Sequence, residues 1–451
     1  MDSKKETHDK KLHFTIIGAG AAGLSIGYYA QKHGFPFIIY ESGERIGGNA
    51  ITLSHDGFLF DSGAHRFHDR NREITSEMAR LMQEELVGIH VPSQIYFDGK
   101  YIDFPLSPLS LMKGLGPLKF LRAGSEVLRG KLNKTEAYDS FASFAVQTYG
   151  KTIAEHFLLN YSEKLWGRPC EKLSLDVAGK RLEGLTLKTF IIEALLGSRA
   201  KTTHLDGSFY YPTKGIGRIA DRMRDYCGQE NIALDSKITK VFHNDQKIIS
   251  VELNHDVEIP VKQLICTIPL NHLLSMMAPA PPQELLDLGK DLKFRCVILA
   301  AFFLDKESVS DNASIYFPEQ EIPFTRIYEP KMRSVNMAPD GKTSIIAEIP
   351  CQMEDNVWLE DDAKILDKVK DHLCTMGLIS DGEVIDTHVH RMHYAYPILE
   401  IGYEKKLATI HSFLGKFPNL RFSGRNGKFA YIHIHDMMEI GREVIGEFLE
   451  S

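Results

Sequence analysis

The feature that most constrains this chain is a glycine-rich turn between an apolar strand and an apolar helix near its start. The run from Leu12 to Ile17 has strand character, and the segment GAGAAG leads from it into LSIGYYAQKHG, which ends at Gly34. A second strand, FPFIIYE, follows and ends on Glu41. This order predicts a strand–helix–strand unit of an α/β, Rossmann-like domain.

The glycines of this turn have the GxGxxG spacing, at Gly18, Gly20 and Gly23, with Ala21 and Ala22 between the last two. The first glycine permits a tight turn, the second lets a pyrophosphate approach the backbone, and the third lets helix and strand pack closely. The helix N-terminus offers N–H groups and a positive dipole end to a diphosphate. Glu41 is placed to accept hydrogen bonds from an adenosine ribose. The unit therefore predicts dinucleotide binding.

The residues directly after Glu41 read SGERIGGNA and supply Ser42, Arg45, Gly47, Gly48 and Asn49. Paired glycines let backbone N–H groups approach an anion, and an arginine supplies a fixed fork of donors. The pattern resembles the glutathione-reductase-type FAD family, which includes amine oxidases, phytoene desaturases, protoporphyrinogen oxidases and UDP-galactopyranose mutases. In that family the arginine and the glycines run beside the FAD phosphates and ribityl chain, so the resemblance implies FAD.

Two further segments carry the same resemblance, to the protoporphyrinogen-oxidase-like and mutase branches. The segment GFLFDSGAHRFHDRN is similar to GxxFDxGxHxF, which implies that Gly63, Ala64 and His65 lie beside the isoalloxazine ring with Arg66 nearby. The segment NYSEKLWGRPC resembles Tyr-x-x-Lys-x-Trp-Gly, which implies that Lys164 and Trp166 line the substrate pocket. Trp166 can equally be a core anchor, and the sequence leaves both interpretations open.

The second half of the chain resembles the family at three more places. The loop through which the chain re-enters the family's FAD domain is similar to SFYYPTKGIGRIADRM. The alternation of KITKVFHNDQKIISVEL predicts a β-hairpin. The resemblance implies that Val241 of this hairpin contacts the adenine. Near the end, a strand leads into GRNG, and we expect a helix after His435-Asp436 to point at the flavin. The residues implied there are Gly424, Arg425, Tyr431, Asp436 and Met437. KFAYIHIHD departs from the family's usual HRYNNxDH.

The order of these motifs predicts two interleaved domains. The FAD-binding domain is predicted from residues 1–71, 206–275 and 406–451, and a mixed α+β substrate domain from residues 72–205, mainly helical, and 276–405. Strand-like runs in the last of these are FRCVILAAFFL, TSIIAEIP and EVIDTHVHRM.

The stretch 106–133 is basic, with Lys113, Lys119, Arg122, Arg129 and Lys131 against the single acid Glu126. A basic amphipathic stretch can lie on a membrane surface or receive an anionic substrate. Such a charge set is also common on the solvated face of ordinary helices, so these alternatives stay open. The sequence leaves peripheral membrane contact through 106–133 as an expectation.

Composition excludes several other classes. A formal net charge of −7 argues against a nucleic-acid partner, and no apolar run approaches the roughly 18 residues of a membrane span. The six scattered cysteines form no CxxC pair, which argues against a zinc site or a disulfide framework, and none lies beyond Cys374, so we expect noncovalently held FAD. Glycines interrupt the apolar stretch after the polar N-terminal residues, which argues against a signal peptide, so we expect a cytoplasmic chain. The histidines of HxHxxH at His388, His390 and His393 lack accompanying ligands, and we expect no metal site.

These features favour an FAD-dependent oxidoreductase that moves a hydride from a carbon or nitrogen of a small-molecule substrate to flavin N5. The expected active-site residues are His65, Arg66, Lys164, Trp166, Arg425 and Tyr431. A redox-neutral mutase acting on a nucleotide-sugar is the first alternative, although no convincing set of diphosphate-clamping arginines and tyrosines is apparent. A non-catalytic FAD-binding partner protein is the second.

Overall fold

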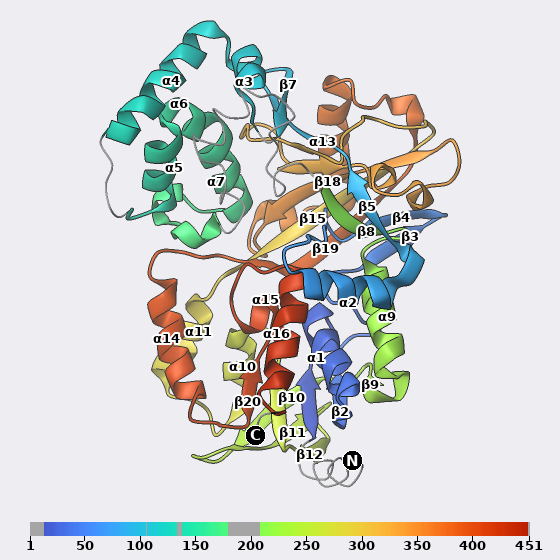
Figure 1. The fold of residues 1–451 in the computed structure, drawn as a ribbon, viewed down its shortest axis with the longest axis vertical. Helices are drawn as coiled ribbons and strands as arrows, with labels where there is room; N and C mark the ends of the chain where they lie inside the picture. The colour runs from blue at the N-terminus through green and yellow to red at the C-terminus, as the bar shows by residue number, and fades with distance from the viewer. Residues whose placement is uncertain (1–12, 105, 133–137, 179–207, 450–451) are drawn as a thin grey trace.

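The computed structural model describes residues 13–104, 106–132, 138–178 and 208–449 (Figure 1). Of the five predicted domain segments, only 276–405 is described from end to end. The others include residues outside the described ranges, chiefly 1–12 and 179–205. Within the described residues, a parallel sheet and a larger mixed sheet organise the fold.

The parallel sheet has the strand order β20-β13-β1-β2-β9, and each neighbouring pair runs parallel. Its strands are β1 (Phe14–Ile17), β2 (Phe37–Tyr40), β9 (Ile232–Ala233), β13 (Gln263–Cys266) and β20 (Leu420–Phe422). The central strand β1 is fully buried, and its sequence FTII has the near-continuous apolar character that a parallel sheet covered on both faces requires. The fold class is therefore the predicted α/β class.

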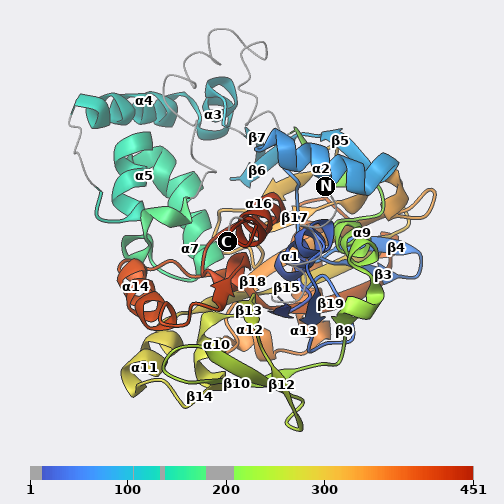
Figure 2. The same ribbon diagram turned by 60° about the horizontal axis from the view of Figure 1, so that its bottom comes forward.

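Helices from three parts of the chain pack together beside this sheet. They are α1 (Ala21–Lys32), α9 (Gly217–Cys227) and α16 (Ile434–Gly446). Figures 1 and 2 show α1 between the other two, and both pack against it. Every residue of α1 from Ala21 to Ala30 is buried, which explains why AAGLSIGYYA is apolar or small on all sides.

A second, four-stranded sheet has the strand order β12-β11-β10-β14. Its strands are β10 (Ile238–His243), β11 (Ile248–Leu253), β12 (Val257–Pro260) and β14 (Met277–Ala278). Strands β10 and β11 pair antiparallel, so the predicted hairpin is confirmed.

The mixed sheet has seven strands in the order β19-β15-β18-β17-β16-β6-β7. They are β6 (Ser93–Phe97), β7 (Lys100–Phe104), β15 (Phe294–Leu304), β16 (Ser314–Tyr316), β17 (Arg326–Tyr328), β18 (Thr343–Cys351) and β19 (Val384–Pro397). Strand β15 pairs antiparallel with both β18 and β19, and it is buried along almost its whole length. The three strand-like runs predicted within 276–405 are confirmed.

The segment 72–205 is predicted to be mainly helical, but its start also contains strands. Strands β6 and β7 extend the mixed sheet, and β5 (Leu86–His90) pairs with β8 (Ser208–Pro212). The pairing of Phe97 with Lys100 leaves a two-residue turn, Asp98-Gly99, in which both residues have positive φ. An Asp-Gly pair between alternating strands is a strong hairpin signal, so SQIYFDGKYIDF carried this information.

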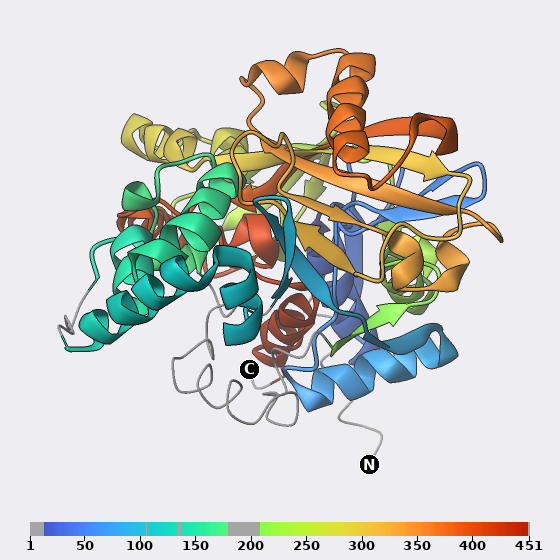
Figure 3. The same cartoon turned by 90° about the horizontal axis from the view of Figure 1, so that it is seen from above.

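The following residues form a helical lobe, which we define as the helices between residues 108 and 166. It contains α3 (Pro108–Leu115), α4 (Pro117–Leu132), α5 (Phe141–Tyr149), α6 (Lys151–Ile153), the π-helix η2 (Ala154–Leu159) and α7 (Asn160–Trp166). Viewed from above, this lobe lies beside the mixed sheet (Figure 3). In the described part of the chain, no helix combines the length and apolarity needed to cross a membrane.

Candidate functional site

A cavity of about 1440 Å³ extends from the parallel sheet to the mixed sheet and the helical lobe. Gly18 and Glu41, which directly follow β1 and β2, line one end, and Ile95 and Phe157 line the other. Ligands of open α/β sheets bind outside the carboxyl ends of the strands, where this cavity begins. Its volume exceeds that of a typical small-molecule pocket and leaves room for a dinucleotide together with a substrate.

The predicted glycine turn lies at the parallel-sheet end, where Gly18, Gly20, Ala21 and Ala22 line the cavity. Among the described residues, no side chain caps the N-terminus of α1, so its first-turn N–H groups are left for a ligand. A Cβ added at Gly20 would meet no atom closer than Gly48 Cα, 3.8 Å away. Gly20 is thus needed for the cavity rather than for the packing of the protein.

Gly23 has the opposite role and does not line the cavity. A Cβ at this position would lie 1.9 Å from the carbonyl oxygen of Gly18, a distance that no side chain can occupy. The absent side chain therefore lets α1 pack against the end of β1, as the third glycine of the motif predicts.

The loop after β2 forms the other side of this cradle. Gly47 N–H donates to Ala19 O at 2.9 Å, which holds the loop against the glycine turn, and Gly48 has a φ of +56°. A Cβ on Gly48 would lie 3.1 Å from Gly20 Cα. Because neither backbone carries a side chain at this point, both can approach a phosphate group.

The remaining predicted residues of this loop also line the cavity: Glu41, Ser42, Arg45 and Asn49. Glu41 accepts the N–H of Ala19 at 2.8 Å through Oε2 and the N–H of Gly43 at 3.0 Å through Oε1. Asn49 Nδ2 donates to the carbonyl oxygen of His393 at 2.9 Å, which ties the loop to β19. The carboxylate of Glu41 thus braces the turn and retains lone pairs that a ribose can use.

The middle of the cavity contains Gly63, Ala64, His65 and Arg66. Burial, assisted by the nearby cations Arg425 and Arg326, lowers the pKa of His65 to about 3, so its imidazole is neutral at physiological pH. The guanidinium of Arg66 donates to Ser93 Oγ at 3.1 Å and lies 4.9 Å from the ring centroid of Phe209.

Beyond this point the cavity has aromatic walls, which we call the aromatic chamber. Its members are Tyr161, Trp166, Tyr316, Tyr396 and Tyr431. The ring centroids of Trp166, Tyr396 and Tyr431 lie 5.7–6.0 Å apart. Trp166 is only 2% exposed and belongs to the hydrophobic core, so it is a core residue that also lines the cavity.

Arg425 lines the cavity next to the aromatic chamber, with its guanidinium 5.4 Å and 5.2 Å from the ring centroids of Tyr396 and Tyr431. It donates to the carbonyl oxygen of Ala395 at 2.8 Å and twice to that of Ile432. Arg425 therefore joins the C-terminal loop to β19 while it places a positive charge against the cavity.

The C-terminal helix begins earlier than predicted. Helix α16 starts at Ile434, with His433 at the N-cap, and Asp436 accepts the N–H of His433 at 2.8 Å. Asp436 therefore caps the helix and does not line the cavity, whereas Gly424 and Met437 do. The start was misplaced because histidine is not among the residues that usually mark an N-cap.

Two other predicted residues lie outside the cavity wall. Lys164 Nζ donates to the carbonyl oxygens of Phe317, Glu319 and Phe324 at 2.8–2.9 Å, so it holds the loop between β16 and β17 rather than the substrate pocket. Val241 is fully buried in β10. Just before β10, the N–H of Ser236 donates to the carbonyl oxygen of Glu41 at 2.7 Å.

A buried ion pair that the sequence analysis missed lies behind Ala64. Arg326 lines the cavity and binds Glu348 through Nε at 2.9 Å and Nη2 at 2.6–2.7 Å, and Glu348 Oε1 accepts the N–H of Ala64 at 2.9 Å. Burial acts to lower the pKa of Arg326, but the Glu348 carboxylate and the surrounding tyrosines together hold that pKa well above the ordinary value. The sequence feature that could have revealed this pair is the single charged residue in each of the otherwise uncharged strands RIY and TSIIAEIPC.

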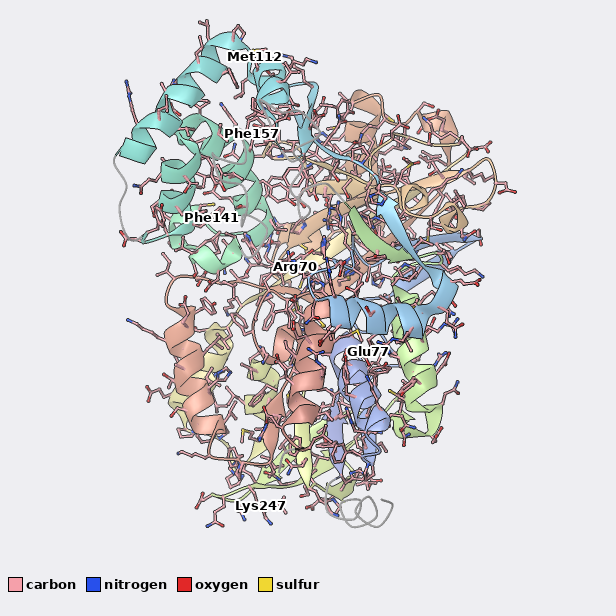
Figure 4. All side chains as sticks on the ribbon, in the orientation of Figure 1. Arg70, Glu77, Met112, Phe141, Phe157 and Lys247 are labelled. Atoms are coloured by element: carbon pink, nitrogen blue, oxygen red, sulfur yellow. The ribbon has the colours of Figure 1, made fainter. Side chains whose placement is uncertain are left out.

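The charge on the cavity wall is strongly positive. Among the described lining residues, the arginines are Arg45, Arg66, Arg70, Arg72, Arg326, Arg391 and Arg425, and the carboxylates are Glu41 and Asp69. Arg70 lies near the centre of the molecule, between the helical lobe and the part that contains the parallel sheet (Figure 4). This balance favours anionic ligands.

The HxHxxH histidines do not lie in a metal cluster. His390 and His393 line the cavity, and burial lowers the pKa of His390 to about 4. In the part of the chain that the structure describes, ligand-type atoms come together at His55, Asp56 and Asp386, a partly exposed group outside the cavity. The absence of a metal stays a prediction.

Comparison with known proteins agrees with this geometry. The family of flavin-containing amine oxidoreductases matches residues 21–436. The chain is 21% identical to coproporphyrinogen III oxidase of Bacillus subtilis (strain 168) over 98% of both chains. Among solved structures, it resembles a reduced UDP-galactopyranose mutase, with a TM-score of 0.86, 18% identity and coverage of 97% of this chain and 94% of that one. Cyclohexylamine oxidase from Brevibacterium oxydans IH-35A has a TM-score of 0.69 and 13% identity, with coverage of 98% of this chain and 99% of that one.

The chain belongs to the family of flavin-containing amine oxidoreductases. It is a flavin-dependent oxidoreductase, and FAD is its cofactor. The cavity fits this cofactor, because the uncapped end of α1 and the side-chain-free strip at Gly20 and Gly48 form a cradle for a diphosphate.

Proposed function

We propose that this enzyme oxidises its substrate by removing a hydride from a carbon or nitrogen atom, as a protoporphyrinogen-oxidase-like flavoprotein. The observation that carries the proposal is the composition of the aromatic chamber. Among the described residues that line the cavity, the carboxylates are Glu41, at the cradle, and Asp69, which accepts the hydroxyl of Thr75 at 2.8 Å. Neither belongs to the aromatic chamber, and removal of a hydride from an electron-rich substrate needs no carboxylate base.

Bound FAD supplies the hydride acceptor, and the protein supplies orientation and charge. The aromatic chamber excludes water, and its rings offer apolar surface against which a flat substrate can pack. Arg425 and the Arg326–Glu348 pair place fixed charges near Ala64 and His65, the residues assigned to the flavin ring by resemblance. A positive charge at this point stabilises the negative charge that develops on reduction.

The same walls indicate the kind of substrate. Aromatic side chains favour a flat or ring-shaped body, and the excess of arginines favours acidic substituents. A porphyrinogen with carboxylate side chains has both properties, and this agrees with the name of the Bacillus subtilis relative, coproporphyrinogen III oxidase.

A redox-neutral mutase is the second candidate, and two observations favour it. The fold matches UDP-galactopyranose mutase with a TM-score of 0.86. The sequence argument against a mutase, the missing arginines and tyrosines, does not hold, since Arg66, Arg326 and Arg425 line one cavity with four tyrosines of the aromatic chamber. A nucleotide-sugar would use the arginines for its diphosphate.

Anaerobic mixing of the oxidised holoenzyme with substrates separates these candidates. We expect coproporphyrinogen III or protoporphyrinogen IX to bleach the flavin spectrum, and Trp166→Phe to slow that bleaching. Trp358→Phe is the matched control, because Trp358 does not line the cavity. Conversion of UDP-galactopyranose only after chemical reduction of the flavin would establish the mutase instead. FAD binding with neither activity would support the non-catalytic alternative and contradict the proposal.

A further inference from the structure

Helices α3 and α4 form the outer edge of the helical lobe, where α5 and α7 lie between them and the parallel-sheet part (Figures 1 and 2). Their inner side packs in a small core that contains Leu111, Leu115, Ala123 and Val127. Their outer side carries large apolar residues that are strongly exposed: Leu109 (59%), Met112 (40%), Leu118 (83%), Leu121 (69%) and Leu128 (61%). Met112 lies at the extreme end of the molecule (Figure 4). We call this the leucine face.

The leucines of α4 are spaced to share one side of the helix. Leu118, Leu121 and Leu128 follow each other at i, i+3 and i+10, which a period of 3.6 residues places in one row. Single exposed leucines are ordinary on a protein surface, but several exposed leucines on one side of a helix mark an interaction site. Helix α4 is therefore apolar on two sides, and among the described residues only its inner side is covered.

Basic side chains flank the leucine face. Lys113, Lys119, Arg122 and Arg129 are all exposed. The one acid of this stretch, Glu126, is half-buried and accepts the N–H of Thr152 at 2.6 Å and Arg122 Nε at 2.9 Å. The whole chain carries a net charge of −7, so this local positive charge opposes the overall sign.

We propose that the leucine face docks on an anionic lipid bilayer, with α3 and α4 lying in the interface. A helix with a leucine row beside arginines and lysines is typical of interfacial binding, in which the apolar side enters the acyl boundary and the cations meet anionic headgroups. Charge disfavours a second copy of the chain as the occupant, because two such faces would bring their cations together. This inference goes beyond the proposed function and does not depend on it.

The docking surface is continuous with the cavity. Phe104, at the end of β7 just before α3, lines the cavity and is 38% exposed, and its ring centroid lies 5.2 Å from that of Tyr316 in the aromatic chamber. A protein docked through α3 and α4 therefore holds this end of the cavity close to the lipid surface, where an amphiphilic substrate would gather.

Vesicle flotation of the full-length holoprotein tests the proposal. We expect binding to vesicles of phosphatidylcholine and phosphatidylglycerol at 7:3, and much weaker binding to phosphatidylcholine alone or in 0.5 M salt. Replacing Leu118, Leu121 and Leu128 by Gln should weaken binding at least tenfold. The matched control is Val335→Gln with Leu359→Gln, which are 73% and 74% exposed and lie away from the leucine face.

A charge variant tests the electrostatic part separately. Lys119→Gln with Arg129→Gln should lower binding to the anionic vesicles about 25-fold, from roughly fivefold for each cation. The yellow colour and the thermal midpoint of each variant report whether the fold is intact.

Three results would overturn the proposal. The first is a wild-type protein that does not float with either vesicle. The second is equal loss of binding in the Val335/Leu359 control. The third is a wild-type dimer in analytical ultracentrifugation that the leucine variant converts to a monomer, without vesicle binding, because a second copy would then cover the face.

Discussion

The buried pair of Arg326 and Glu348 makes a quantitative prediction about the wall behind Ala64. Glu348→Gln keeps the shape of the side chain, and its amide oxygen can still accept the N–H of Ala64. The amide cannot neutralise Arg326, which is 9% exposed and donates hydrogen bonds to Glu348 through two nitrogens. The variant therefore leaves an uncompensated charge at the cavity wall.

Removal of one partner from a buried ion pair costs about 3–5 kcal/mol of unfolding free energy. We expect Glu348→Gln to fall in this range. The double variant Glu348→Gln with Arg326→Met should be less destabilised than the single one, because the unpaired charge is gone. Glu360→Gln serves as the control, since Glu360 pairs with the exposed Lys368 and such a pair contributes about 0–1 kcal/mol.

Urea unfolding of the cofactor-free proteins, followed by circular dichroism, measures these differences. A second readout is the flavin reduction potential of the holoproteins, which Glu348→Gln should raise, because unneutralised Arg326 favours the reduced, more negative flavin. A loss below about 1 kcal/mol in Glu348→Gln, equal to that of the surface control, would refute the assignment of a buried, structurally important pair.

Three further predictions concern other residues. Gly20→Val should fold normally yet purify without FAD, because the added side chain would enter the open cavity. The control Gly124→Val, which faces open space on α4, should keep its flavin. Gly23→Ala should instead lower the thermal midpoint, because its Cβ would overlap the carbonyl oxygen of Gly18. Burial lowers the pKa of His65 in the folded protein to about 3, from an ordinary 6.5. Between pH 6.5 and pH 3 the unfolded chain therefore binds a proton at this residue that the folded protein does not, so the free energy of unfolding decreases as the pH falls through this range. His65→Gln should reduce the slope of unfolding free energy against pH between 4 and 6, by at most about 1.4 kcal/mol per unit. Lys164→Met should destabilise the protein by about 1–3 kcal/mol while it retains FAD, because three partly buried carbonyl groups lose their donor. Loss of substrate oxidation without loss of stability would instead show a catalytic role.

Most of the dinucleotide cradle could be predicted because its chemistry is local in sequence. The turn at Gly18–Gly23 and the loop at Arg45–Asn49 each satisfy a backbone requirement that few other residues meet. The strands β15 and β18 could also be predicted, because their apolar runs are long. The hairpin at Asp98-Gly99 was not predicted, although an Asp-Gly pair favours such a turn, because the whole segment 72–205 was predicted to be mainly helical.

The substrate end of the cavity could be predicted only in part, because it is assembled from distant strands. Arg326 and Glu348 meet across neighbouring strands β17 and β18, and Tyr316, Tyr396 and Tyr431 come from three separate segments. Lys164 was assigned to the pocket from its neighbours in a motif, but a lysine side chain is long enough to turn toward a different loop. Val241 does not line the cavity, and a hairpin motif alone does not fix which of its residues lies near Glu41.

The dinucleotide cradle is tested most directly by identification of the bound cofactor in the purified full-length protein. We expect two flavin bands in the visible spectrum and, after heat denaturation, release of FAD at about one per chain with a colourless pellet. A colourless protein that cannot be reconstituted with FAD would contradict the cradle at Gly20 and Gly48, and with it the assignment of the cavity.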